Sequence, residues 1–130
     1  MKQQIQLLET ILAKLSKEIL SWDELQNILN PVESPEKLIE DLSIATALKF
    51  WNGEMPYSKG DLIINRLFSY WSASESFDKN RMFAGIAWEV YLAFDAGEFY
   101  RPGEDRGINP SEKYTMPLVE TILRKQKQII

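Results

Sequence analysis

The segment from residue 78 to residue 100 constrains the fold most, because apolar side chains occur on nearly every side of the helix that it predicts. Its large apolar residues are Met82, Phe83, Ile86, Trp88, Val90, Tyr91, Leu92, Phe94 and Phe99. A helix without a polar face has to be surrounded by other helices. We therefore expect an all-α fold, a single-domain bundle of five or six helices around a central apolar helix over residues 78–100.

Four helices are expected before this segment. The first, over residues 3–20, carries apolar residues at steps of three and four, and these are Ile5, Leu8, Ile11, Leu12, Leu15 and Ile19. Ser21 and Glu24 have the spacing of a capping box and predict a short second helix, which Asn30-Pro31 ends. Ser34-Pro35-Glu36 predicts the start of a third helix, and Asn52-Gly53 predicts its end.

A fourth helix is predicted to begin between Ser58 and Asp61 and to be followed by a polar connector over residues 72–76. After the central helix, the prolines, glycines and charges of residues 101–109 indicate a surface loop. Asn109-Pro110 predicts another helix start, and Pro117 should kink that helix or restart it from Thr115. The apolar side of this last helix is expected to be Leu118, Val119, Ile122 and Leu123.

Length and composition agree with one domain over residues 1–130. The chain is 45% hydrophobic and 26% charged, which is typical of a globular protein. The longest stretch of low charge is interrupted by Glu89, and the first residues do not resemble a secretory signal, so we expect a cytoplasmic protein without a membrane segment. Absence of cysteine fits a reducing compartment without establishing one.

The formal net charge of −4 bears on the class of partner. An acidic surface repels phosphate backbones, so direct binding of nucleic acid is not expected. The same charge favours a basic protein as partner.

The chain contains neither histidine nor cysteine, which excludes Ser-His-Asp and Cys-His catalysis and the usual zinc sites. A carboxylate-dependent metal enzyme is the remaining catalytic alternative, with acids on two helices, namely Glu36, Glu40, Asp41, Asp95 and Glu98. However, Glu36 has the position of a first-turn acid, and Glu40 and Asp41 lie opposite an apolar stripe. We therefore expect no metal, no cofactor and no enzymatic activity.

Glu89 lies among large apolar residues and is expected to be at least partly buried. A buried carboxylate has to be paired, hydrogen-bonded or protonated. Arg66 or Arg81 would supply the charge in a structural ion pair, and the alternative is a catalytic acid.

The stretch AWEVYLAFDAGEFY, residues 87–100, together with the charged loop and PSEKYT, residues 110–115, resembles segments of small bacterial immunity proteins. These proteins neutralise polymorphic toxins, including those of contact-dependent growth inhibition. The resemblance implies a non-enzymatic protein that binds a cognate toxin domain, often a nuclease, and blocks its active site. The acidic composition is compatible with a basic partner of this kind.

The partner-binding surface is predicted at the end of the central helix and in the loop that follows, where four acids and an aromatic residue gather: Asp95, Glu98, Tyr100, Glu104 and Asp105. The alternative is that Arg101 and Arg106 neutralise these acids locally and the loop is a connector. A different class of function also stays open, that of a self-associating helical adaptor, which would pair through Leu8, Leu15 and Ile19 and the terminal Ile129-Ile130.

Overall fold

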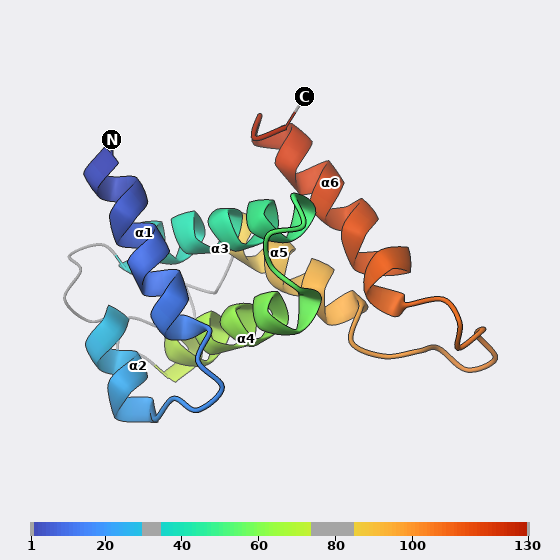
Figure 1. Cartoon of the computed structure of the whole chain (residues 1–130), viewed down its shortest axis with the longest axis horizontal. Helices are drawn as coiled ribbons and strands as arrows, with labels where there is room; N and C mark the ends of the chain where they lie inside the picture. Colours follow the sequence, from blue (N-terminus) through green and yellow to red (C-terminus); the bar gives the residue numbers. More distant parts are fainter. Residues whose placement is uncertain (1, 30–34, 74–84, 130) are drawn as a thin grey trace.

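The structure is a computed structural model, and it describes residues 2–29, 35–73 and 85–129 (Figure 1). Its α-helices are α1 (Lys2–Leu15), α2 (Trp22–Leu29), α3 (Pro35–Trp51), α4 (Tyr57–Ala73), α5 (Gly85–Ala96) and α6 (Met116–Lys125). A π-helical turn, η1 (Ser111–Thr115), leads into α6. The described residues include no strand, so the prediction of an all-α bundle is confirmed. None of the described helices combines the length and the apolar content needed to cross a bilayer.

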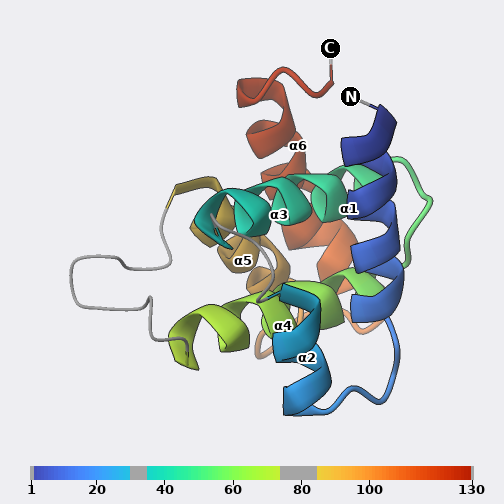
Figure 2. The same ribbon diagram turned by 90° about the vertical axis from the view of Figure 1, so that its left-hand side faces the viewer.

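The helices α3, α4 and α5 form the centre of the bundle. α3 packs against both α4 and α5, while α1 crosses α3 and α4 on one side and α6 packs on α3 and α5 (Figures 1 and 2). All six helices contribute to one core, whose fully enclosed side chains include Leu15, Leu42, Ile63, Leu67, Phe94 and Leu123. Both chain ends lie on the same side of the molecule (Figure 2).

The central helix is shorter and less enclosed than its sequence predicts. Helical structure in α5 covers Gly85–Ala96, residues 97–100 are not helical, and residues 78–84 lie outside the described residues. α5 is central, since it packs on α3, α4 and α6. It is not surrounded on every side, because Trp88 and Leu92 are exposed. Two of the apolar residues that predicted complete burial therefore lie on a side of α5 that is open to solvent.

The first helix ends at Leu15 and not at residue 20. Arg66, on α4, explains this end, because its guanidinium donates hydrogen bonds to the carbonyls of Leu15 at 2.6 Å and Glu18 at 3.1 Å. These bonds satisfy carbonyls that a helix terminus leaves without partners. Beyond this end Ile19 is 89% exposed, whereas Leu15 is enclosed in the core. The stripe of Leu8, Leu15 and Ile19 is therefore not a continuous surface for self-association.

Several predicted helix boundaries are confirmed. The backbone N–H of Glu24 donates to Ser21 Oγ at 3.1 Å at the start of α2. Gly53 follows α3 with a φ of 76°, a left-handed conformation that glycine adopts without strain. α4 begins at Tyr57, one residue before the predicted range, and continues through Ser72 to Ala73 into the predicted connector. The caps at Asn30-Pro31 and Ser34 lie outside the described residues.

Pro117 restarts the last helix, as predicted. The π-helical turn ends at Thr115, and α6 then begins with Pro117 in its first turn. Asn109 Oδ1 accepts hydrogen bonds from Ser111 N at 2.9 Å and Ser111 Oγ at 2.7 Å, which fixes the entry to the turn. The prediction for Leu118 is wrong, because this side chain is exposed while Val119, Ile122 and Leu123 are buried.

Candidate binding surface at the end of α5

An exposed apolar stripe runs along α5. Trp88, Leu92 and Asp95 are spaced by four and three residues, which places them on one side of the helix. Trp88 is 38% exposed, Leu92 45%, and Phe99, just after the helix, 72%. Clustered exposed apolar side chains are typical of interaction sites on soluble proteins. We call Trp88, Leu92, Asp95, Glu98 and Phe99 the α5 surface.

Neighbouring aromatic rings hold one end of the α5 surface in place. The Trp88 ring stacks on that of Tyr91 with centroids 5.4 Å apart, and the ring of Phe68, from α4, stacks on Tyr91 at 4.5 Å. Offset contacts of this kind stabilise an aromatic cluster beyond the area that they bury. Trp88 is therefore positioned before any partner arrives.

Carboxylates lie at the other end of the α5 surface. Asp95 is exposed and Glu98 half-buried. Asn65 Nδ2, from α4, lies 3.4 Å from Glu98 Oε1 and donates to the Asp61 carbonyl at 2.8 Å. Burial, followed by the negative charge of Glu98, raises the pKa of Asp61 to about 7. Asp61 Oδ1 is enclosed and has no hydrogen-bond partner among the described residues.

The raised pKa of Asp61 predicts a stability that depends on pH. The folded state binds this proton more tightly than the unfolded state does, so the Asp61 contribution to the free energy of unfolding falls as pH rises from about 4 to about 7. Asp61→Asn should therefore leave stability unchanged near pH 4. At pH 8 it should add about 1–2 kcal/mol, a value reduced for the solvent exposure of a half-buried group.

Urea unfolding of both proteins at each pH measures this difference. Asp41→Asn is the matched control, because Asp41 forms an ion pair with Lys37 at 2.8 Å and should lose stability when it is neutralised. Equal stability of wild type and Asp61→Asn at pH 8 would contradict the prediction.

The end of α5 is held by side chains from two other elements. Tyr57, at the start of α4, donates its hydroxyl hydrogen to the Phe94 carbonyl. Thr115 Oγ1, at the end of η1, donates to the Ala93 carbonyl at 2.7 Å. Burial, together with the charges of Asp61 and Glu98, raises the pKa of Tyr57, so this phenol stays protonated as a donor. The carbonyls of the last turn of α5 thus have fixed partners, and the chain after the helix has a defined direction.

Glu104 closes the loop of residues 101–109 onto η1. Its carboxylate accepts hydrogen bonds from Lys113 Nζ at 2.7 Å, from the Tyr114 hydroxyl and from the Arg101 backbone N–H. The bonds from Lys113 and Tyr114, with that from Arg101, lower the pKa of Glu104 to about 2. The loop is therefore held by its own side chains.

The structure divides the predicted partner-binding residues into two groups. Asp95 and Glu98 join the α5 surface. Glu104 is engaged by Lys113, Asp105 accepts the Gly107 N–H at 2.8 Å, and Tyr100 donates to the Arg106 carbonyl at 2.9 Å. These three residues take part in hydrogen bonds within residues 100–113, which leaves less of their hydrogen-bonding capacity for a partner.

The sequence left open that Arg101 and Arg106 neutralise the loop acids, but the guanidinium groups of both lie over aromatic rings. The Arg101 guanidinium lies 3.7 Å from the centroid of the Tyr114 ring, and that of Arg106 lies 4.6 Å from the centroid of Tyr100. Neither side chain forms an ion pair with an acid within the described residues. Lys113, on η1, is the cation that pairs with a loop acid.

Glu89 is partly buried, as predicted, but its ion-pair partner is neither of the two expected arginines. The Glu89 side chain is 41% exposed, and its Oε1 lies 3.7 Å from Lys125 Nζ on α6. Of the two expected partners, Arg66 binds carbonyls at the end of α1 and just after it, and Arg81 lies outside the described residues. Glu89 is not fully buried because Ala87, Val90 and Phe94 take the buried side of α5.

Sequence reasoning missed the exposed Trp88 and Leu92, and it missed Asp61 and Asn65. The spacing of Trp88, Leu92 and Asp95 was a usable signal, because it mixes apolar residues with an acid along one side of a helix. Asp61 and Asn65 carried no such signal, since α4 approaches Glu98 only in the tertiary structure.

Within the described ranges, no group of three or more acids is placed to hold a metal ion. Asp41 pairs instead with Lys37, which lies one turn before it on α3. Comparison with known proteins found no matching family model, no matching curated protein and no matching solved structure.

Proposed function

We propose that this chain is a non-enzymatic binding protein that neutralises a cognate toxin domain by covering it with the α5 surface. The observation that carries the proposal is that the exposed Trp88 and Leu92 share one side of α5 with Asp95, and that Glu98 and the exposed Phe99 follow directly after the helix. An apolar centre with charged residues at its edge is the usual composition of a protein interface.

The chemistry of the α5 surface specifies a basic partner. Tryptophan is enriched among the residues that contribute most of the binding energy at protein interfaces. The Trp88 ring is already stacked on the ring of Tyr91. Asp95 and Glu98, with Asp61 behind them, favour an arginine or lysine of the partner and disfavour an acid. The net charge of −4 accelerates encounter with a basic domain.

The toxin is the more specific part of the proposal, and it rests on the resemblance described above. Residues 87–100, which resemble segments of bacterial immunity proteins, contain every member of the α5 surface. A nuclease domain has a basic substrate-binding face, and an acidic, aromatic surface is complementary to such a face.

Reversing both charges of the α5 surface should break the complex. Asp95→Lys with Glu98→Lys is expected to weaken binding to the product of the adjacent toxin reading frame by about 30-fold or more, equivalent to about 2 kcal/mol, because buried charge pairs become repulsive. Isothermal titration measures the affinity, after circular dichroism has shown that the variant is folded. Glu18→Lys with Asp23→Lys is the matched control, since both acids are exposed and distant in sequence from α5.

The two parts of the proposal have separate tests. Unchanged affinity of the Asp95/Glu98 variant would remove the α5 surface as the binding site. A neighbouring gene product that binds but is not toxic, or whose toxicity this chain does not suppress in cells, would contradict neutralisation.

A further inference from the structure

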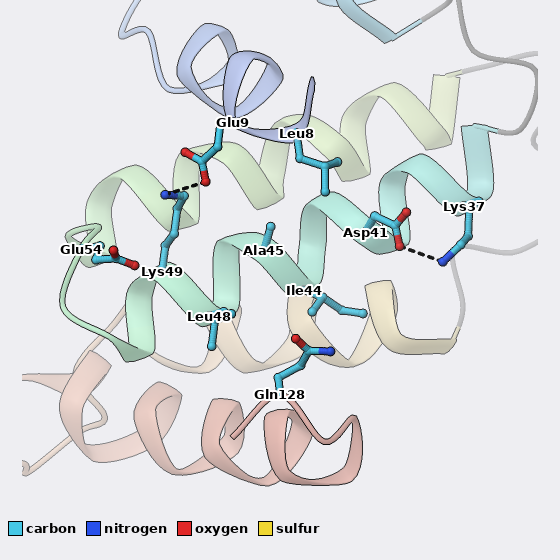
Figure 3. Close-up of a pocket in the computed structure, with 10 residues that line it drawn as sticks. All are labelled: Leu8, Glu9, Lys37, Asp41, Ile44, Ala45, Leu48, Lys49, Glu54 and Gln128. Carbon is cyan, nitrogen blue, oxygen red and sulfur yellow. Dashed lines mark hydrogen bonds and ion pairs between the residues drawn. The ribbon is translucent and has the colours of Figure 1, made fainter. Parts of the chain in front are cut away.

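A second surface, separate from the α5 surface, is an open groove of about 540 Å³ on α3. Leu8 and Glu9 of α1 form one wall, and Gln128, in the segment after α6, lies at the opposite side (Figure 3). We call this the α3 groove. Its volume is in the range of sites that bind ligands or side chains of partners.

The floor of the α3 groove is a helical ridge. Ile44, Ala45 and Leu48 are half-buried and lie at steps of one and three residues, so they share one side of α3. Elsewhere α3 is covered along most of its length, with buried residues Leu38, Ile39, Leu42, Ser43, Thr46, Ala47 and Phe50. Within the described residues, the groove is thus the side of a core helix that the other helices leave uncovered.

Charged residues mark the two ends of the groove. At the end near the start of α3, Lys37 Nζ pairs with Asp41 at 2.8 Å. At the other end, Lys49 Nζ pairs with Glu9 at 2.9 Å, and Glu54 is exposed and has no ion pair within the described residues. The first end is neutral, whereas the second, with two acids and one lysine, carries a net negative charge.

We propose that the α3 groove binds an amphipathic helix of a protein partner, with aliphatic side chains against Ile44, Ala45 and Leu48 and a lysine or arginine opposite Glu54. A helix fits because the part of α3 from residue 37 to residue 49 is about 18 Å long. The side-chain ridges of one helix pack into the grooves between the ridges of another. The small side chain of Ala45 leaves room at the middle of the floor for a larger side chain of the partner. Glu54, which has no ion pair within the described residues, requires a positive charge on the partner helix, at the end of that helix that lies opposite Glu54.

A charge exchange tests both the site and the chemistry of the partner. The probe is a synthetic amphipathic peptide of about 14 residues, long enough to span the groove, with one leucine stripe and a terminal lysine. Fluorescence anisotropy with the full chain should show saturable binding. Glu54→Lys should weaken it by about two- to fivefold, as expected for an exposed ion pair, and a peptide with glutamate in place of that lysine should regain the lost affinity on Glu54→Lys. Glu112→Lys, at an exposed acid that does not line the groove, should change nothing.

Ala45→Trp provides a second, steric test, because the larger side chain fills the middle of the floor. We expect at least a tenfold loss of peptide affinity with the fold retained. Absence of saturable binding to wild type would overturn the proposal, as would equal affinity of both peptides for Glu54→Lys or unchanged binding to a folded Ala45→Trp variant. Dimerisation of the wild type that Ala45→Trp abolishes would also overturn it, since the occupant would then be a second copy. None of these results bears on the α5 surface, so the two proposals fail independently.

Discussion

Phe94→Asp is expected to unfold the protein at room temperature. Phe94 is fully enclosed, and its ring lies 5.7 Å from that of Tyr57 and 5.3 Å from that of Phe50. Loss of the buried ring alone costs about 3–5 kcal/mol, and an unpaired buried carboxylate adds several more. The free energy of unfolding of a domain is about 5–15 kcal/mol, so the summed loss is comparable with the whole stability of the protein. Circular dichroism with thermal denaturation should show no cooperative transition.

Leu92→Asp is the matched variant, since it introduces the same charge on the same helix. Leu92 is 45% exposed, so the carboxylate stays in water and the melt should remain cooperative, with a loss of about 1 kcal/mol or less. The sequence pattern predicts that both variants unfold, whereas the structure separates them. A folded Phe94→Asp protein, or an unfolded Leu92→Asp protein, would mean that the orientation of α5 is wrong.

Among the glycine-to-alanine substitutions, Gly97→Ala should lower the free energy of unfolding the most. A Cβ at Gly97 would lie 2.2 Å from Thr115 Oγ1 and 2.9 Å from the backbone Cα of Ser111. Because the second neighbour is main chain, η1 itself has to move, and Thr115 would lose its hydrogen bond to the Ala93 carbonyl. We expect a loss of about 2–3 kcal/mol in the free energy of unfolding, at the upper part of the range for overpacked sites.

Gly107→Ala is the control for this prediction. A Cβ there would meet only the Asp105 side chain, at 3.2 Å, on an exposed loop where that side chain can move. Its effect should stay below about 0.5 kcal/mol, as for most surface substitutions. Guanidinium unfolding of both variants gives the comparison. A loss for Gly107→Ala equal to that of Gly97→Ala would show that the η1 contact is not the cause.

Local features of the sequence were sufficient for the class of fold and for most helix starts. Ser21 and Glu24 formed the expected cap, and Pro117 restarted the last helix as predicted. Such signals work from sequence because the partners lie within a few residues, so their geometry is independent of the rest of the fold. Apolar spacing likewise identified Leu15, Val119 and Leu123 as core residues.

Only the tertiary structure decided the features that depend on partners distant in sequence. α1 ends at Leu15 because Arg66, 51 residues later, binds its carbonyl. α5 has an open side because the helices that pack on it within the described residues leave Trp88 and Leu92 partly exposed, although their apolar character predicts burial. Glu98 meets Asn65 because α4 and α5 pack together, and this proximity places Asp61 of α4 near Glu98, which follows α5. Sequence periodicity determines which side chains share a face of one helix, but which faces are covered depends on how the helices pack against one another.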